Sequence, residues 1–159
     1  MKPLAIVLSD AQISAYVSEP KELPANFLSR AYPKSKRGHK ESELAVAGSS
    51  GSEYRLIFRL SIINPLDFSA ILAVRLPNST RLFRLRRYNG KSHEHTNRIE
   101  RATFFGFHIH KATERYQDMG LDEDAYAEPT DRYSDYSTAV QCLVEDCGCT
   151  LAAGDALLF

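Results

Sequence analysis

The sequence predicts a single α+β domain built on an antiparallel meander sheet of about five or six strands. A short N-terminal helix precedes the sheet, and a C-terminal helix packs on one of its faces. Two segments with apolar residues at every second position predict neighbouring strands. An Asn-Gly pair after a third such segment predicts a tight hairpin. A helical spacing of apolar residues near the C-terminus predicts the covering helix.

Residues 1–40 are predicted to form a short helix followed by a basic loop or arm. Ser9 can cap a helix that runs to Tyr16, and Pro20 lies just beyond its end. From there to residue 40 the chain contains prolines, a glycine and a basic run at 34–40, with no apolar periodicity. We therefore expect a loop in this part of the chain.

Residues 43–110 are predicted to form the sheet. The strand 54–62 alternates most clearly, with apolar residues on one face and Arg55 and Arg59 on the other. The strand 68–76 repeats the pattern and sends Arg75 outward. The expected strands are 43–47, 54–62, 68–76, 80–88 and 103–110, with a further strand directly after the Asn-Gly pair at 89–90.

Residues 111–159 are predicted to contain an acidic loop and the C-terminal helix. In the segment 134–146 apolar residues recur at helical spacing, and Gly148 follows as a stop signal. A single helical turn can form within 111–119, before the acidic loop at 121–131. We expect one domain over residues 1–159, because a chain of roughly 150 residues buries a full hydrophobic core.

The composition is that of a globular protein, with 43% hydrophobic and 25% charged residues. The apolar stretch near the N-terminus is too short for a signal peptide, and no run approaches the ~20 apolar residues that span a bilayer. The three cysteines are an odd number, which favours reduced thiols. These features predict a cytoplasmic protein without membrane contact.

The charges divide sharply between two parts of the chain, although the net charge is zero. Residues 1–111 contain 18 Lys and Arg against 9 Asp and Glu, a net charge of +9. Residues 112–159 contain 2 against 11, a net charge of −9. A basic part attracts anions such as phosphate, and an acidic part can shield it or bind a basic partner. The alternative is that the two parts neutralise each other within the fold.

Histidines and arginines are expected to share the outer face of the sheet. An alternation that buries Phe83 and Leu85 sends their neighbours outward. A two-residue turn at 89–90 then places every second residue of the next strand on that face, and the strand 103–110 adds two histidines. The residues expected on this face are Arg55, Arg59, Arg75, Arg84, Arg86, Tyr88, Lys91, His93, His95, His108 and His110.

The first chemistry that fits this face is metal-independent cleavage of RNA. Histidine acts as general acid and base near neutral pH, and cations stabilise the charge that develops on the phosphate. The catalytic candidates are His93, His95, His108, His110, Arg84 and Arg86. The candidate ligand-binding residues are Tyr88, Lys91, Arg55, Arg59, Arg75 and Arg115.

The second chemistry is a metal site formed by the same four histidines, with Zn or another divalent transition metal as cofactor. His93 and His95 lie two residues apart on one strand and can reach one ion. Together with Glu100 they resemble the spacing of the cupin metal motif. Gly90 does not match the upstream glycine of that motif, and its third histidine segment is missing.

Two further interpretations involve no reaction. Arginines on the outer face could bind RNA phosphates without cleaving them, or the histidines could satisfy hydrogen bonds at an edge of the sheet. Arg115 could line the same pocket. An ion pair with Glu114, Asp118 or another local carboxylate is its more ordinary role.

The segment from Phe83 to His110 contains Phe-Arg-Leu-Arg-Arg-Tyr-Asn-Gly, followed by His-Glu-His and His-Ile-His. It resembles small bacterial proteins of the TumE type, regarded as toxins of toxin–antitoxin pairs, in which an Arg-Tyr-Asp-Asn strand end precedes His-x-His. This chain differs in its Asn89-Gly90 turn, its N-terminal arm and its acidic tail. The resemblance implies an RNA-directed toxin held in check by a protein antitoxin.

A function from another class is a non-enzymatic inhibitor encoded by a phage or mobile element. Its acidic half would imitate nucleic acid and bind a basic protein partner. Asp122, Glu123 and Asp124 are the residues expected to form that surface.

Overall fold

The computed structural model describes residues 6–32 and 39–151, and it confirms the α+β fold class. A six-stranded antiparallel sheet has the order β2-β3-β4-β5-β8-β9. Its strands follow one another as a meander, interrupted by a separate two-stranded hairpin, β6–β7. The sheet strands are β2 (His39–Ala47), β3 (Glu53–Ser61), β4 (Phe68–Arg75), β5 (Leu82–Asn89), β8 (His108–Lys111) and β9 (Ala127–Pro129).

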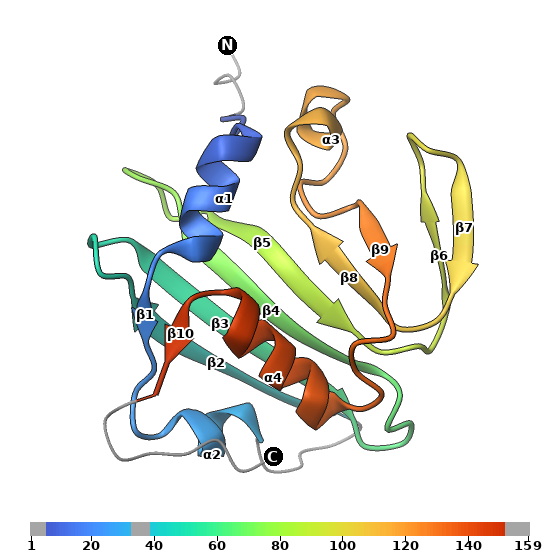
Figure 1. The fold of residues 1–159 in the computed structure, drawn as a ribbon, viewed down its shortest axis with the longest axis horizontal. Helices are drawn as coiled ribbons and strands as arrows, with labels where there is room; N and C mark the ends of the chain where they lie inside the picture. Colours follow the sequence, from blue (N-terminus) through green and yellow to red (C-terminus); the bar gives the residue numbers. More distant parts are fainter. Residues whose placement is uncertain (1–5, 33–38, 152–159) are drawn as a thin grey trace.

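Helices α1 (Asp10–Ser18) and α4 (Tyr136–Asp146) cover one face of the sheet, which we call the helix face (Figure 1). The apolar residues of alternating strand positions, such as Leu56, Phe58 and Leu72, are fully buried there. Burial of apolar side chains stabilises the folded state by about 25 cal/mol per Å² of apolar surface removed from water. The predicted N-terminal and C-terminal helices are thus both present, and they hold the core on the helix face.

Side-chain caps define where the two covering helices begin. The Ser9 side chain accepts a hydrogen bond from the backbone of Gln12, and the Gln12 side chain reaches back to the backbone of Ser9. Asp135 and Thr138 form the same reciprocal arrangement at the start of α4. Each cap satisfies N–H groups that the first turn of a helix cannot pair internally. The stop signal at Gly148 is also correct, since this glycine has a φ of 67°.

The loop expected between Lys21 and Lys40 is more regular than its sequence indicates. Strand β1 (Lys21–Glu22) pairs in parallel with β10 (Cys149–Thr150), and α2 (Phe27–Ala31) follows. Phe27 packs edge-on against Phe58, which explains this short helix, because propensity alone does not hold five residues helical. Of the predicted basic run, residues 34–38 lie outside the described residues.

The tight hairpin predicted at Asn89-Gly90 is wrong. Neither residue has a positive φ, so this is not the turn that the pair usually forms. The Gly90 N–H instead donates to the Phe68 carbonyl oxygen at 3.0 Å, so the chain continues alongside β4. The return strand β6 (Glu94–Asn97) pairs with β7 (Ala102–Phe105) and not with β5. As Figure 1 shows, this hairpin stands beside β8 and β9.

The predicted face assignment fails partway along β5 because of a bulge. Arg84 pairs with Ala73 and Arg86 pairs with the next residue, Leu72, so Leu85 is an extra residue in β5. An extra residue reverses the alternation of all following side chains. Arg86 and Tyr88 therefore lie on the helix face. Arg87 lies instead on the opposite face, where Arg86 and Tyr88 were expected.

The strand predicted over 103–110 is two strands. Gly106, with a φ of 150°, separates β7 from β8. A continuous strand that turns His108 and His110 outward would bury Phe105, Phe107 and Ile109 by alternation. Phe107 and Ile109 do point toward the core, whereas Phe105 is 62% exposed because it belongs to the hairpin and not to the sheet. The short turn expected after β8 is α3 (Glu114–Asp118).

Gly90 allows a test of why glycine occupies this position. A Cβ atom there would lie 1.9 Å from the carbonyl oxygen of Leu66, a backbone atom that cannot move aside easily. We expect Gly90→Ala and Gly90→Asn each to lower the free energy of unfolding by about 1–3 kcal/mol, measured by urea denaturation. A turn with positive φ would tolerate asparagine, so a neutral Gly90→Asn would contradict the close backbone approach. The exposed Ser92→Ala is the control and should change stability by less than about 0.5 kcal/mol.

Candidate functional site

Three of the four predicted histidines come together on the sheet face opposite the helices. His108 and His110 belong to β8, and His95 comes from β6 of the hairpin. One ring nitrogen from each of the three lies within 4.8 Å of the others. We call His95, His108 and His110 the histidine triad. His93 precedes β6 and is exposed, with its ring centroid 6.1 Å from that of His108.

Strand alternation on β8 supplies two members of the triad. Ile109 points into the core, so His108 and His110 both point to the opposite face. They would be solvent-exposed on an open sheet, yet they are only 0% and 7% exposed. The Tyr133 hydroxyl fixes the start of this strand, because it lies 2.7 Å from the carbonyl oxygen of Asn89 and 2.9 Å from that of His108.

The hairpin contributes the third imidazole through the side chain of Asn97. This amide donates to the Ala127 carbonyl oxygen at 2.7 Å and accepts from the Ala127 N–H at 2.9 Å. Ala127 lies on β9, the edge strand of the sheet, directly opposite His110 in the pairing. The two hydrogen bonds thus attach the hairpin to the sheet edge and place His95 beside the β8 histidines, with ring centroids 5.4 Å from His108 and 4.8 Å from His110.

Hydrogen bonds to backbone carbonyls assign the protons on the two buried rings. His108 Nδ1 lies 2.8 Å from the carbonyl oxygen of Gly106, and His110 Nδ1 lies 2.7 Å from that of Asp124. A carbonyl oxygen only accepts, so both Nδ1 atoms carry the proton. In the neutral rings, both Nε2 atoms therefore keep a lone pair. The Asn89 amide approaches the Nε2 of His108 at 3.4 Å, a long contact.

The proton on His95 is assigned in the same way but is found on the other nitrogen. Its Nε2 lies 2.7 Å from Oδ1 of Asn97. The two bonds to Ala127 fix which amide atom is the oxygen, so Nε2 of His95 must donate. The lone pair of the neutral ring is then on Nδ1. Each member of the triad thus donates outward through one nitrogen and keeps the other as an acceptor.

Burial keeps the β8 imidazoles neutral. The pKa of His108 lies below its ordinary value mainly because the ring is buried, with neighbouring positive charges acting in the same direction. Burial lowers the pKa of His110 to about 3, and the positive charge of Arg87 contributes to the shift. Neutral imidazole is the form that binds metals, and the form that cannot donate a proton as a general acid.

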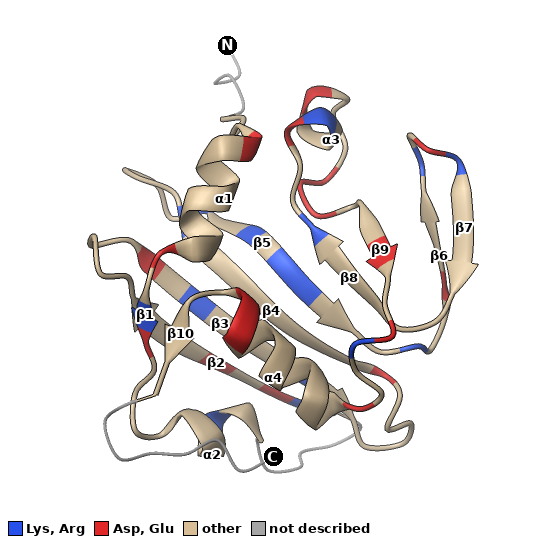
Figure 2. Cartoon of the chain, in the orientation of Figure 1, with Lys and Arg blue, Asp and Glu red and all other residues tan. Residues whose placement is uncertain are grey.

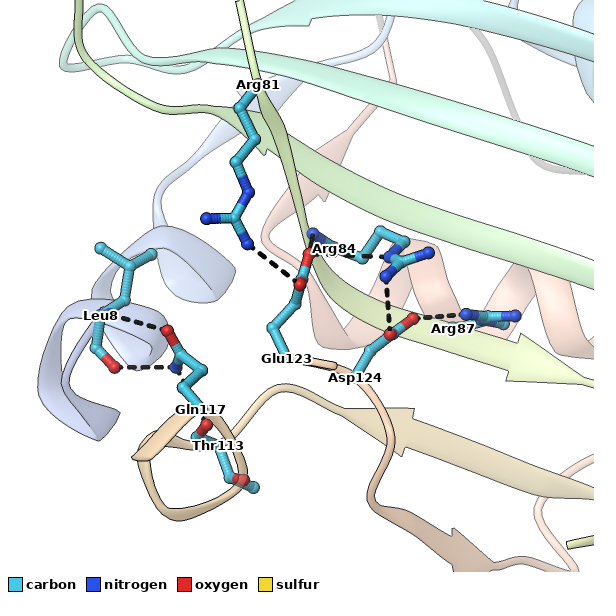
Figure 3. Close-up of polar contacts among 8 residues, drawn as sticks. All are labelled: Leu8, Arg81, Arg84, Arg87, Thr113, Gln117, Glu123 and Asp124. Carbon is cyan, nitrogen blue, oxygen red and sulfur yellow. Dashed lines mark hydrogen bonds and ion pairs between the residues drawn. The ribbon is translucent and has the colours of Figure 1, made fainter. Parts of the chain in front are cut away.

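A buried cluster of opposite charges lies on the same face, next to the triad. Glu123 contacts Arg81 at 3.1 Å and Arg84 at 3.6 Å, and Asp124 contacts Arg84 at 3.3 Å and Arg87 at 2.5 Å. Figure 3 shows both carboxylates between the three guanidinium groups. Figure 2 shows the blue positions along β5 and the red positions of the segment between α3 and β9 that faces them. The basic and acidic parts of the chain thus neutralise each other here, and of the three predicted partner-binding carboxylates only Asp122 is exposed.

The other predicted cations do not join the triad. On the outer face Arg55, Arg59 and Arg75 contact carboxylates of β2 and β3. Lys91 lies over the ring of Phe107. Arg115 pairs with Glu100 in the β6–β7 turn, and not with either neighbour expected from the sequence.

The placement expected for Tyr88 is wrong. Its ring is fully buried on the helix face, and its hydroxyl donates to Asp146 at 2.7 Å, so it offers no surface to a ligand. Arg86 shares that face, where its charge acts on Asp146 and Cys147. Both corrections follow from the bulge at Leu85.

Four residues near the triad were not predicted to contribute to the histidine site, namely Arg87, Asn89, Asn97 and Asp124. The adjacent Arg86 and Arg87 break the alternation of β5, and this was the available signal for a bulge. The other three act through hydrogen bonds between distant segments, which no periodicity in the sequence encodes.

The buried His110 predicts a specific pH dependence of stability in chelator-treated protein. Its pKa is about 3 when folded, against about 6.5 for an exposed histidine. Below pH 6.5 the unfolded chain therefore binds a proton that the folded chain does not, and stability falls as the pH decreases. When the pH is lowered from 7 to 5.5, the free energy of unfolding should decrease in both proteins, and by about 1 kcal/mol less in His110→Gln than in the wild type. Urea denaturation at both pH values measures this, and an equal loss in both proteins would contradict it.

Within residues 6–32 and 39–151, no helix has the length and apolar character needed to cross a bilayer. Comparisons of the chain with models of protein families, with curated proteins and with solved structures found no match.

Proposed function

We propose that the protein binds one divalent transition-metal ion through His95, His108 and His110 and leaves at least one coordination position open. The observation that carries this proposal is the assignment of the ring protons. All three imidazoles donate one N–H to a fixed carbonyl or amide oxygen. This outer hydrogen bond is the usual feature of metal-binding histidines, because it fixes the tautomer and makes the other nitrogen a better ligand.

The spacing of the triad fits an ion after a small adjustment. Zinc binds histidine nitrogen at about 2.0–2.1 Å in tetrahedral geometry, which separates two ligand atoms by roughly 3.4 Å. One ring nitrogen of each triad histidine lies within 4.8 Å of those of the other two. Small rotations of the rings, above all of the half-buried His95 on its hairpin, can close this gap.

The ligand set also indicates the kind of metal. Imidazole suits zinc, copper, iron and nickel, whereas magnesium and calcium prefer oxygen ligands. Three histidines with a free position are typical of catalytic zinc sites, in which bound water becomes a nucleophile near neutral pH. The sequence suggested four histidine ligands. The proposal uses three of them and leaves out His93, which is exposed at the edge of the site.

Metal titration tests the proposal directly. The purified protein, stripped with chelator, should bind one Zn²⁺ or Co²⁺ per chain, measured by calorimetry and elemental analysis. At a metal concentration of about 100 times Kd, binding should stabilise the folded chain by about 2.7 kcal/mol. His95→Ala should lose stoichiometric binding, because its ring supplies one of three ligands.

Two variants complete the metal experiment. Asn97→Ala should keep the six-stranded sheet and weaken metal binding by at least about 10- to 100-fold, since it releases the hydrogen bond that orients His95 and the two bonds that attach its hairpin to Ala127. His93→Ala is the matched control and should leave stoichiometry unchanged. Wild-type protein that binds no metal, or a His95→Ala variant that binds as tightly as wild type, would contradict the proposal.

Metal-independent cleavage of RNA is the second candidate function. It is favoured by the exposed His93 beside the neutral His108, because that pair could supply an acid and a base. Of the two arginines expected to stabilise the phosphate, Arg84 pairs with Glu123 and Asp124 and Arg86 lies on the helix face, which weakens this candidate. The resemblance of residues 83–110 to TumE-type toxins, and with it a protein antitoxin, stays a prediction.

Incubation with RNA separates the two candidates. Cleavage that persists in excess chelator and decreases at least about 100-fold in His93→Ala would support the metal-independent reaction. We expect instead no cleavage in chelator by wild type or His93→Ala. Gel analysis of a labelled single-stranded RNA provides the measurement.

A further inference from the structure

The charge around the histidine triad points to the kind of ligand that the site would accept. Neutral imidazoles add no negative charge, so an ion held by the triad would keep its full charge of +2. The rings hydrogen-bond to carbonyl and amide oxygens of Gly106, Asp124 and Asn97, and none of these groups is a carboxylate. The centre would therefore attract an anion to its open position.

The neighbouring ion cluster does not cancel this charge. Arg81, Arg84 and Arg87 face the two carboxylates of Glu123 and Asp124. Three positive charges against two negative ones leave the cluster with a net charge of +1. Glu123 and Asp124 are only 7% and 2% exposed, whereas the side chains of Arg81, Arg84 and Arg87 are 44%, 37% and 23% exposed, so solvent screens the charge of Arg87 least among the three.

Arg87 is the arginine of β5 that pairs with a member of the triad. It lies directly opposite His110 in the β5–β8 pairing, so both side chains rise from the same face. One terminal nitrogen of Arg87 pairs with Asp124, whose own backbone carbonyl accepts from His110. Asp124 therefore fixes the guanidinium group and the imidazole together.

Arg87 also retains an unused hydrogen-bond donor. Its Nε is buried and has no hydrogen-bond partner in the described part of the chain. A buried donor without a partner costs about 1–3 kcal/mol. The planar guanidinium group is suited to bind two oxygens of a carboxylate or phosphate at once.

We infer that the open position of the proposed metal centre takes a small oxyanion, a carboxylate or phosphate group, which Arg87 binds through its guanidinium group with the unpartnered Nε as one donor. The inference rests on the proposed metal function and adds a ligand class to it. One oxygen of the anion coordinates the ion and a second oxygen accepts from Arg87. This arrangement satisfies the free donor and offsets the charge of the centre.

Cobalt spectroscopy tests the inference because it reports on metal and anion separately. Chelator-stripped protein is loaded with Co²⁺, and the visible spectrum first shows whether the ion is bound. Inorganic phosphate and acetate are then titrated in separate arms. We expect saturable spectral changes with at least one anion, and the arm with the lower Kd identifies phosphate or carboxylate as the preferred source.

Three variants test the role of Arg87. Arg87→Gln should bind one Co²⁺ per chain and bind the anion about 10- to 100-fold more weakly, as expected for the loss of a charged hydrogen bond. Arg87→Lys keeps the charge but lacks the planar guanidinium group, so its affinity for the anion should lie between those of the wild type and Arg87→Gln. Arg59→Gln is the matched control, because Arg59 is an exposed residue of β3 and its substitution changes the net charge by the same amount. It should bind the anion as wild type does.

The outcomes separate the two proposals. A wild-type protein that binds no Co²⁺ overturns the metal function and this inference with it. A protein that binds Co²⁺ but responds to neither anion, or whose Arg87→Gln variant binds the anion as tightly as wild type, overturns the inference alone. An equal weakening in Arg59→Gln would assign the effect to net charge and also overturn it.

Discussion

The arrangement of the histidine triad depends on the two hydrogen bonds between the Asn97 side chain and the backbone of Ala127. The β6–β7 hairpin shares no strand pairing with the six-stranded sheet, so side-chain contacts such as these fix its position. Asn97 is 6% exposed, and loss of its amide would leave a buried N–H and a buried carbonyl unsatisfied. The same amide oxygen orients His95. One side chain therefore connects a peripheral hairpin to the sheet edge, covers the β8 histidines and fixes a tautomer. Arg115, paired with Glu100, provides a second and more exposed attachment.

Two local irregularities explain why β8 and β5 present different residues from those that simple alternation gives. The bulge at Leu85 reverses the second half of β5, so that Arg87 and Asn89 lie with His110 and His108 in the β5–β8 pairing. Gly106 ends the hairpin and allows β8 to begin with a new orientation. Bulges often occur where a sheet changes the direction of a functional side chain. Here the reversal buries Tyr88 in the core and brings an arginine to the histidines.

The sequence patterns predicted the elements of the fold better than their connections. The alternation in 54–62 and 68–76 and the helical spacing in 134–146 reflect burial against one continuous core, and burial is what periodicity records. The four histidines were recognised as candidates by composition and spacing. Their convergence could not be derived, because it depends on Asn97 reaching Ala127 and on Tyr133 reaching the start of β8. The prediction that all four lie on one face depended on a tight turn at Asn89-Gly90. The glycine is instead required because the backbone of Leu66 approaches it too closely for a Cβ atom.

The hairpin attachment and the proposed metal site are expected to be thermodynamically linked. His95 reaches the β8 histidines only when the hairpin is docked, whereas His108 and His110 are held by the sheet itself. A metal ion that bridges the two parts binds the docked state alone, so it stabilises docking by as much as docking improves its affinity. The neutral state of His108 and His110 lowers the cost of this step, because no proton has to leave those rings before the ion binds. The hairpin that includes the exposed Phe105, preceded by the exposed His93, would then be held more firmly against the sheet when the metal is bound, which gives a peripheral hairpin a direct influence on the triad.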